Sequence, residues 1–485
     1  MSSNYREQWT SVGGHFPSHW QFFKLEELLE NTKGIAVGVM YPGDHTAEGI
    51  PLIKVGDVKD GYIASQPSFF ISPEVDEEYK RTRLNGTELL ITLVGNPGDC
   101  VVVEPYMAGW NAARALAVVR LKDTGLREWL KYILLSKPAK HLIDARLNTT
   151  VQKTLNLKDI RELGIPIPPK HERDMIIKNI SAIEQKKIVN SDTNQTLEQM
   201  AQALFKSWFV DFEPVKAKIA VLEAGGSQED ATLAAMTAIS GKDADALAVF
   251  EREHPEQYAE LKATAELFPS AMKNSEVGAI PEGWNIGKLG DIIEFNPKRV
   301  LKKGNIAPYL DMKNVPITGH SAQEIIDREF SSGSKFRNGD TLLARITPCL
   351  ENGKTAFVDF LLTDEMIGWG STEFIIMRSK QSLPLSLSYF LARLDYFRTI
   401  AIQSMQGTSG RQRADASVLE QHIWVVPPNE ILKKFGIFSD SVLNCNRARN
   451  AENNALTQLR DTVLPKLLSG EITLPEAEQI ISEEA

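Results

Sequence analysis

The sequence is poor in the features that mark secreted, membrane and metal proteins. It has three cysteines in 485 residues, and Cys100, Cys349 and Cys445 form neither a CxxC pair nor a cluster with histidines. This supports neither a disulfide framework nor a metal site, so we expect buried free thiols. No apolar run approaches the roughly 18 residues of a membrane span, and residues 1–10 lack a signal-peptide core. We therefore expect a cytoplasmic protein that does not enter a membrane.

Catalytic motifs are missing as well. Residues 352–355 (Asn-Gly-Lys-Thr) resemble the end of a phosphate-binding loop, but Pro348 stands where GxxxxGK[ST] requires its first glycine. There is no Asn/Asp-Pro-Pro-aromatic element and no glycine-rich cofactor loop. Asp364, Glu365 and Glu373 fit no nuclease pattern and are predicted to be solvated. The sequence predicts no catalytic residue and no cofactor for this chain.

Positive charge is in deficit overall, with a net charge of −9, but the acidic residues are unevenly placed. Residues 216–280 carry 11 acidic against 6 basic residues, and residues 471–485 carry 5 against none, so the remainder is about +1. Basic residues gather there in four groups: Arg81 and Arg83; Arg299, Lys302 and Lys303; Lys335 and Arg337; Arg411 and Arg413. Each group either contacts phosphates or is an ordinary solvated surface.

What the sequence does contain is an internal repeat. Trp20, Lys24, Leu25 and Glu30 recur at the same spacing as Trp284, Lys288, Leu289 and Glu294. Asn85-Gly86 with Leu89-Leu90 returns as Asn338-Gly339 with Leu342-Leu343, and Gly109-Trp110 returns as Gly368-Trp369. The period far exceeds the roughly 20 to 50 residues of a solenoid repeat, so the sequence predicts two whole domains.

Each repeat mixes strand-like and helical segments. Residues 87–94 and 374–378 are strand-like, and residues 126–136 and 385–393 are typical of helices. Each repeat closes on an apolar strand with a proline pair, at 165–169 and 424–428. This pattern predicts an α+β fold with two tandem mixed α/β domains.

A long helix is predicted after each proline pair. Both segments have apolar residues at three-four spacing with a polar centre, which is typical of a coiled coil whose register is set by buried polar groups. The proposed seam positions match at a constant offset of 259: Ile183, Asn190, Leu197 and Leu204 with Val442, Arg449, Leu456 and Val463. We expect the two helices to pair antiparallel about a pseudo-twofold axis. The alternative is that each helix covers only its own domain.

At this point the sequence resembles the specificity subunit of type I restriction-modification systems. The resemblance extends over nearly the whole chain, and these motifs carry it: Pro281, Gly283 and Trp284; the proline pairs; Leu204-Phe205-Lys206-Ser207-Trp208-Phe209-Val210-Asp211-Phe212; and Leu464-Pro465-Lys466-Leu467-Leu468-Ser469-Gly470-Glu471-Ile472. Two departures are Pro17-Ser18-His19-Trp20 at the first repeat and the acidic insertion 216–280, whose residues 231–250 and 254–268 look helical.

The resemblance implies a division of the chain and a set of partners. It implies target-recognition domains at 1–171 (module 1) and 281–429 (module 2), a central helix at 172–215, the insertion at 216–280, a C-terminal helix at 430–470 and an acidic tail at 471–485. In such subunits each module reads one half of a bipartite site on double-stranded DNA. The helices set the spacer and dock two methyltransferase subunits, and motor-nuclease subunits complete the enzyme.

Two equivalent loops just before the proline-pair strands are the predicted DNA contacts. They are rich in side chains that hydrogen-bond to bases or phosphates: Arg146, Asn148, Thr149, Thr150, Gln152 and Lys153 in module 1, and Gln406, Thr408, Ser409, Arg411, Gln412 and Arg413 in module 2. The alternative is a polar turn that caps the next strand. Because the two loops differ, we expect an asymmetric site. The rival function is a protein-interaction scaffold that does not read DNA.

Overall fold

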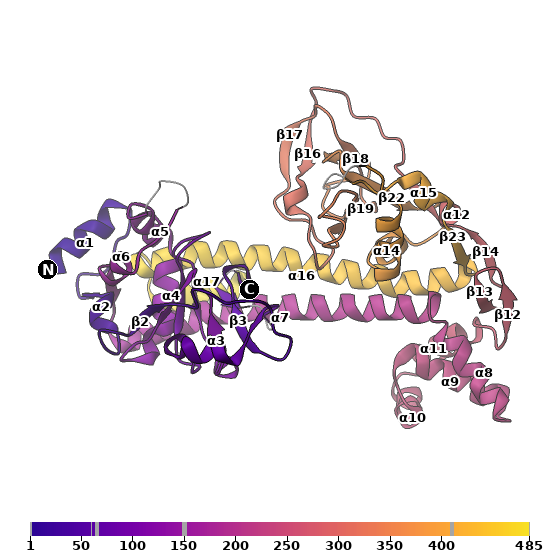
Figure 1. Cartoon of the computed structure of the whole chain (residues 1–485), viewed down its shortest axis with the longest axis horizontal. Helices are drawn as coiled ribbons and strands as arrows, with labels where there is room; N and C mark the ends of the chain where they lie inside the picture. The colour runs from indigo at the N-terminus through magenta and orange to yellow at the C-terminus, as the bar shows by residue number, and fades with distance from the viewer. Residues whose placement is uncertain (1, 60, 64–66, 148–152, 408–411, 485) are drawn as a thin grey trace. The chain divides into compact units, whose positions relative to one another are not determined.

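The computed structural model describes residues 2–59, 61–63, 67–147, 153–407 and 412–484. The chain divides into two compact units, one formed by residues 1–186 and 455–485 and the other by residues 187–454. The first unit contains module 1 and the second contains module 2 and the insertion (Figure 1). Within the described ranges, no helix is long and apolar enough to cross a membrane.

Module 1 is built on a four-stranded sheet in the order β2-β10-β7-β8, formed by Ile35–Val37, Leu116–Val119, Leu89–Thr92 and Cys100–Val102. A smaller sheet has the order β6-β3-β9 (Phe70–Ile71, Ile50–Ile53, Asn111–Ala112), β4 (Val58–Lys59) pairs with β5 (Tyr62–Ile63), and β1 (Gln21–Lys24) pairs with β11 (Gly164–Ile167). The helices are α1 (Ser2–Ser11), α2 (Leu25–Leu28), α3 (Pro73–Glu78), α4 (Arg127–Leu135), α5 (Lys137–Asp144) and α6 (Leu157–Arg161).

Module 2 repeats this arrangement. Its central sheet has the order β15-β22-β19-β20 (Ile293–Phe295, Phe374–Ser379, Thr341–Ala344, Thr355–Phe357). The smaller sheet has the order β17-β16-β21-β18 (Ile326–Glu329, Ile306–Leu310, Gly368–Gly370, Ser334–Phe336), and β14 (Asn285–Lys288) pairs with β23 (Ile423–Val426). The helices are α12 (Leu289–Ile292), α13 (Ser386–Ala392), α14 (Asp395–Gln403) and α15 (Ala416–Gln421).

The repeat seen in the sequence is a repeat of the fold. The strand that follows Trp20 pairs antiparallel with the strand that precedes the first proline pair, and the strand after Trp284 does the same in module 2. The register agrees, because Lys24 faces Gly164 and Lys288 faces Ile423 at the equivalent ends. Both tryptophans are buried. The prediction of two tandem mixed α/β modules is confirmed.

The two long helices are α7 (Lys170–Phe209) and α16 (Asn429–Ser469). The first is shorter at its C-terminal end than the predicted segment 172–215. Phe212 has a left-handed backbone with φ 55°, and Pro214 lies in the first turn of the next helix. The chain turns at Phe212, and the aromatic side chains on both sides of the helix end, Phe209 and Phe212 among them, lie in the core of the second unit.

The two helices pack against each other in antiparallel orientation. In the second unit, Asn190 Nδ2 donates to Glu452 Oε2 at 2.8 Å and to Asn453 Oδ1 at 3.0 Å, whereas Phe205, further along α7, contacts Phe435, further back on α16. Residue numbers thus increase along α7 while the numbers of their partners on α16 decrease, so the two helices are antiparallel. The predicted antiparallel coiled coil is confirmed.

Amide side chains fill the middle of this seam. Asn194 Nδ2 donates to the backbone oxygen of Asn446 at 3.3 Å and to Asn450 Oδ1 at 3.0 Å. Asn446 Nδ2 donates in return to the backbone oxygen of Asn194 at 3.1 Å. Asn194 and Asn446 are buried, and a buried amide must find its partners within the protein. These contacts therefore fix the register of the two helices.

The same contacts recur on the other side of the seam. Asn453 Nδ2 donates to the backbone oxygen of Lys187 at 3.4 Å and to Ser191 Oγ at 3.3 Å. Asn453, Asn446 and Asn450 lie 259 residues after Asn194, Lys187 and Ser191 respectively. The two sets of hydrogen bonds are counterparts, so a pseudo-twofold axis passes between the helices at the amide cluster.

The eight predicted seam residues are buried to different degrees. Ile183, Asn190, Val442, Leu456 and Val463 are buried, whereas Leu197, Leu204 and Arg449 are partly exposed. Leu197 and Leu204 pack against the core of the second unit.

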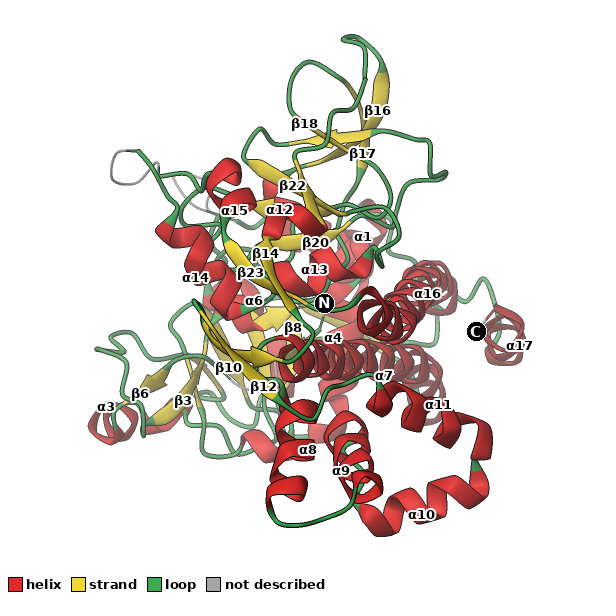
Figure 2. Ribbon diagram, turned by 90° about the vertical axis from the view of Figure 1, so that its right-hand side faces the viewer, coloured by secondary structure: helices red, strands yellow, loops and turns green. Residues whose placement is uncertain are grey.

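The acidic insertion is largely helical (Figure 2). It forms α8 (Glu213–Glu223), α9 (Gln228–Ser240), α10 (Ala244–Glu253) and α11 (Pro255–Glu266), followed by the hairpin of β12 (Met272–Ser275) and β13 (Gly278–Pro281). The segment 231–250 is divided into two helices, because Gly241 caps α9 with a left-handed φ of 67°. The acidic tail also contains a helix, α17 (Leu474–Glu484).

A buried histidine joins α7 to module 2. His320 is 1% exposed, with Nε2 3.1 Å from Asp359 Oδ2 and Nδ1 3.6 Å from Glu198 Oε2. The hydroxyl of Tyr389 donates to Glu198, and Arg393 Nε donates to that hydroxyl at 3.0 Å. Burial opposes protonation of the imidazole, but the two carboxylates outweigh it and raise the pKa of His320 to about 9.

This histidine makes stability depend on pH. Because its pKa is raised above the unfolded value of about 6.5, its contribution is complete below pH 6.5 and disappears as the pH rises through about 9. Between these values the free energy of unfolding should fall by up to about 3 kcal/mol. Urea unfolding of the wild type and of His320→Gln over this range measures the effect. Parallel pH profiles for the two proteins would contradict it.

Candidate nucleic-acid interface

The two predicted contact loops occupy equivalent places. One joins α5 to α6 and the other joins α14 to α15. Each passes the end of a central strand, where Thr154 forms a bridge with Val94 and Arg413 forms one with Ile346. Thr154 and Arg413 are 259 residues apart, as are the paired-helix positions. The loops are therefore related by the same repeat as the helices.

In module 1, two of the six predicted contact residues are described. Arg146 Nη1 donates to the backbone oxygen of Leu142 at 3.0 Å, and Nη2 donates to Gln8 Oε1 of α1 at 3.2 Å. Lys153 is exposed and lies 3.7 Å from Asp144. Arg146 thus already has acceptors within the module, while Lys153 is available to solvent. Asn148, Thr149, Thr150 and Gln152 lie outside the described residues.

In module 2, Gln406 and Arg413 exchange two backbone hydrogen bonds of 3.0 Å, which close the base of the loop. The backbone oxygen of Gln412 accepts from the amide of Thr347 at 3.3 Å. The guanidinium of Arg413 donates to both oxygens of Glu373 at 2.7 to 3.0 Å. Thr408, Ser409 and Arg411 lie outside the described residues.

The structure corrects the expectation that Glu373 is simply solvated. It is 22% exposed at the side chain, and its hydrogen bonds with Arg413 lower the pKa of the carboxyl. Little in the sequence points to this contact, because Glu373 and Arg413 are separated by 40 residues. Only the folded sheet places the start of β22 beside the loop.

Some of the predicted basic groups are engaged within the protein. Arg83 binds Asp76 and Glu77, and Arg299 forms a two-pronged ion pair with Asp340, which is 0% exposed. Lys302 and Lys303, beside Arg299 in sequence, are exposed. Charge clusters that look alike in the sequence thus divide into internal ion pairs and solvent-facing lysines.

The segment that resembles a phosphate-binding loop has a structural explanation. Lys354 Nζ donates to the backbone oxygens of Met312 and Lys313 at 2.8 and 3.2 Å. Its ammonium group therefore ties two loops of module 2 together. Among the described residues, no group of three or more histidine, cysteine or acidic side chains is placed to hold a metal ion.

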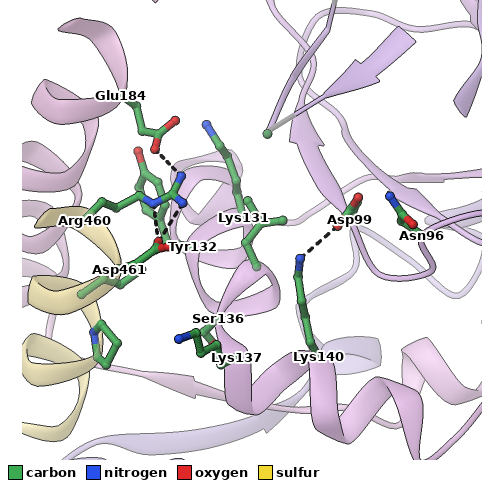
Figure 3. A pocket seen from close by; sticks show the side chains of 14 residues that line it. Asn96, Asp99, Lys131, Tyr132, Ser136, Lys137, Lys140, Glu184, Arg460 and Asp461 are labelled. Atoms are coloured by element: carbon green, nitrogen blue, oxygen red, sulfur yellow. Dashed lines mark hydrogen bonds and ion pairs between the residues drawn. The ribbon is translucent and has the colours of Figure 1, made fainter. Parts of the chain in front are cut away.

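A pocket of about 500 Å³ in the first unit is lined by charged residues of module 1 and the long helices (Figure 3). Glu184 accepts from Arg460 at 2.7 Å, Arg460 also binds Asp461, and Lys140 lies 3.4 Å from Asp99. The dashed contacts in Figure 3 show that these charged side chains are paired with one another. The Glu184–Arg460 pair fastens α7 to α16 beside the module.

Comparison with known proteins identifies the class. Residues 17–199 match the family model described as the type I restriction modification DNA specificity domain. The HindI specificity subunit of Haemophilus influenzae is 30% identical over 72% of this chain and 78% of its own length. The MjaIX specificity subunit of Methanocaldococcus jannaschii is 22% identical over 96% of both chains. A solved S subunit from M. genitalium aligns with 93% of this chain and 96% of its own at 13% identity, with a TM-score of 0.46.

This chain therefore belongs to the family of type I restriction enzyme specificity subunits. The family suggested by the tryptophan, proline-pair and helix motifs is confirmed.

The internally paired arginine and the exposed lysines of this loop should respond differently to substitution. Arg299→Met removes a partner from the buried Asp340 and should lower the free energy of unfolding by about 3 kcal/mol. Lys302→Met and Lys303→Met change exposed positions of the same loop. Their free energies of unfolding should stay within about 0.5 kcal/mol of the wild-type value. Denaturant titration of the three variants decides. Equal effects would mean that Arg299 is not the anchor of this loop.

Proposed function

We propose that this chain is the non-catalytic subunit that gives a type I restriction-modification complex its DNA sequence specificity. Each module reads one half of an asymmetric bipartite site on double-stranded DNA, and the paired helices set the distance between the halves. The observation that carries the proposal is the duplicated fold with different side chains in the two equivalent loops. Two copies of one module, joined by a symmetric pair of helices, are suited to binding two separated half-sites. Different side chains in the two contact loops are suited to recognising different bases.

The outer faces of the long helices support docking of two methyltransferase subunits. Each helix carries four exposed, uncharged residues spaced seven positions apart. They are Ala182, Val189, Thr196 and Ala203 on α7, and Ser441, Ala448, Ala455 and Thr462 on α16. The sets correspond at the offset of 259. Small residues at a seven-residue spacing form a seam on which another helix packs closely. Two equivalent seams suit two copies of one partner, and motor-nuclease subunits complete the proposed complex.

Genome-wide mapping of N6-methyladenine tests the proposed specificity. In the source cell, deletion of this chain should abolish methylation of one bipartite, asymmetric motif and leave other motifs unchanged. The lost motif would give both half-sites and the spacer. If all methylated motifs persist although the methyltransferase subunits are expressed, the chain is a scaffold without a DNA-reading role.

The docking seam has its own test. Ala448→Lys places a charge in the centre of the α16 seam, where helix propensity is nearly unchanged. We expect at least about tenfold weaker capture of the methyltransferase subunit, corresponding to about 1.4 kcal/mol. The matched control is Asn454→Lys, which adds the same charge at an exposed position on another face of α16 and should bind normally. Equal capture by both variants would exclude this seam as the docking surface.

A further inference from the structure

The two modules share one backbone frame at the end of their central sheets. In module 1, the Leu93 amide donates to the Ala115 oxygen at 2.8 Å, and the Leu93 oxygen accepts from the Leu155 amide at 2.9 Å. In module 2, the Arg345 amide donates to the Glu373 oxygen at 2.9 Å, and the Arg345 oxygen accepts from Ala414 at 2.8 Å. With the bridges Val94–Thr154 and Ile346–Arg413, every contact of the frame has its counterpart.

The side chains on this frame differ in chemistry. The equivalent positions are Leu93, Ala115 and Thr154 in module 1, and Arg345, Glu373 and Arg413 in module 2. None of the three is charged in module 1, and all three are charged in module 2. A conserved frame with divergent side chains is the arrangement expected where two copies of one fold recognise different ligands.

One donor of the Arg345 guanidinium has no acceptor within the protein. Its Nε is buried without a hydrogen-bond partner. The neighbouring Thr347 Oγ1 is likewise buried and unpartnered. A guanidinium carries five donors, and leaving such donors unsatisfied in a partly buried place is costly. An acceptor from a bound ligand would remove this cost.

The charges around Arg345 indicate what kind of acceptor this is. Glu373 is held by Arg413, and Arg345 adds to the positive charge that lowers the pKa of the Glu373 carboxyl. Asp415 is ionised nearby: its hydrogen bonds to Ser417, with a smaller contribution from Arg345, lower its pKa. Together with the guanidinium groups of Arg345 and Arg413, these two carboxylates leave the cluster without net charge, which favours an uncharged partner over a phosphate group. The edge of a guanine base is uncharged and offers the acceptors O6 and N7 in the spacing of a guanidinium fork.

We propose that Arg345 reads a guanine in the half-site recognised by module 2, with Glu373 and Arg413 as its immediate surroundings. Glu373 is a positioning residue, because it fixes the orientation of the Arg413 guanidinium through three contacts of 2.7 to 3.0 Å. In module 1, Leu93 stands at the place of Arg345, so the other half-site is read without an arginine there. This inference rests on the proposed function and makes it specific to one residue and one base.

The test uses the full chain assembled with its methyltransferase subunits on a DNA library with randomised half-sites. Arg345→Ala should lose selectivity for guanine at one position of one half-site, by about 5- to 150-fold, the range for a bidentate contact. The other half-site and the spacer should be unchanged. Recognition of that half-site serves as the internal control that the complex has folded and assembled.

Two further variants distinguish the proposed base contact of Arg345 from the positioning role of Glu373 and from the effect of a surface charge. Glu373→Gln removes the negative charge beside Arg413 and should broaden recognition in the same half-site only. Lys303→Ala, an exposed lysine of the same module, should leave the guanine preference intact. The inference is overturned if Arg345→Ala keeps the wild-type motif, or if it lowers methylation evenly across all sequences, as a phosphate contact would. If the wild-type complex itself methylates no defined motif, the proposed function fails instead.

Discussion

The antiparallel pairing of α7 and α16 is the interaction on which the rest of this structure depends. Its apolar ends hold the helices together, while the buried amides at its centre decide their alignment. Asn194 and Asn453 make equivalent hydrogen bonds to opposite helices, and a shift by one turn would break both sets and leave the buried Asn194 without these partners. A buried polar group without a partner costs about 1 to 3 kcal/mol, which opposes such a shift. Register, and with it any spacing that the helices measure, is therefore set by a few asparagines.

Each module combines a constant frame with variable side chains. The backbone contacts at the end of the central sheet agree between Leu93 and Arg345, because hydrogen bonds of a sheet edge do not depend on side-chain identity. The backbone contacts are therefore kept although the side chains at those positions differ, with Leu93 in the core of module 1 and Arg345 partly exposed in module 2. This separation suits the proposed reading of two different half-sites by one architecture.

Burial, more than position in the sequence, decides which charged side chains of this protein form internal ion pairs and which face solvent. Arg299 and Lys302 are three residues apart, yet the first is locked to a fully buried carboxylate and the second faces solvent. Glu373 is similar, since the sequence predicts an ordinary solvated acid and the structure gives it an arginine partner. An account of nucleic-acid contacts based on counting basic residues would therefore mix anchoring arginines with available ones.

The sequence by itself determined the duplicated α+β modules, the two long helices, their antiparallel pairing and the family. The modules and helices follow from local spacing, because periodic apolar residues, the proline pairs and a repeat at constant offset are all readable along the chain, and the family follows from the resemblance of the motifs. The sequence also predicts the two loops as DNA contacts, which stays a prediction, but it does not single out Arg345, it misjudges Glu373, and it places the end of the first helix beyond Phe209. Those points depend on which distant segments meet. Glu373 and Arg413 become partners only when β22 and the loop before α15 reach the same sheet edge, and long-range burial of that kind is decided by tertiary packing.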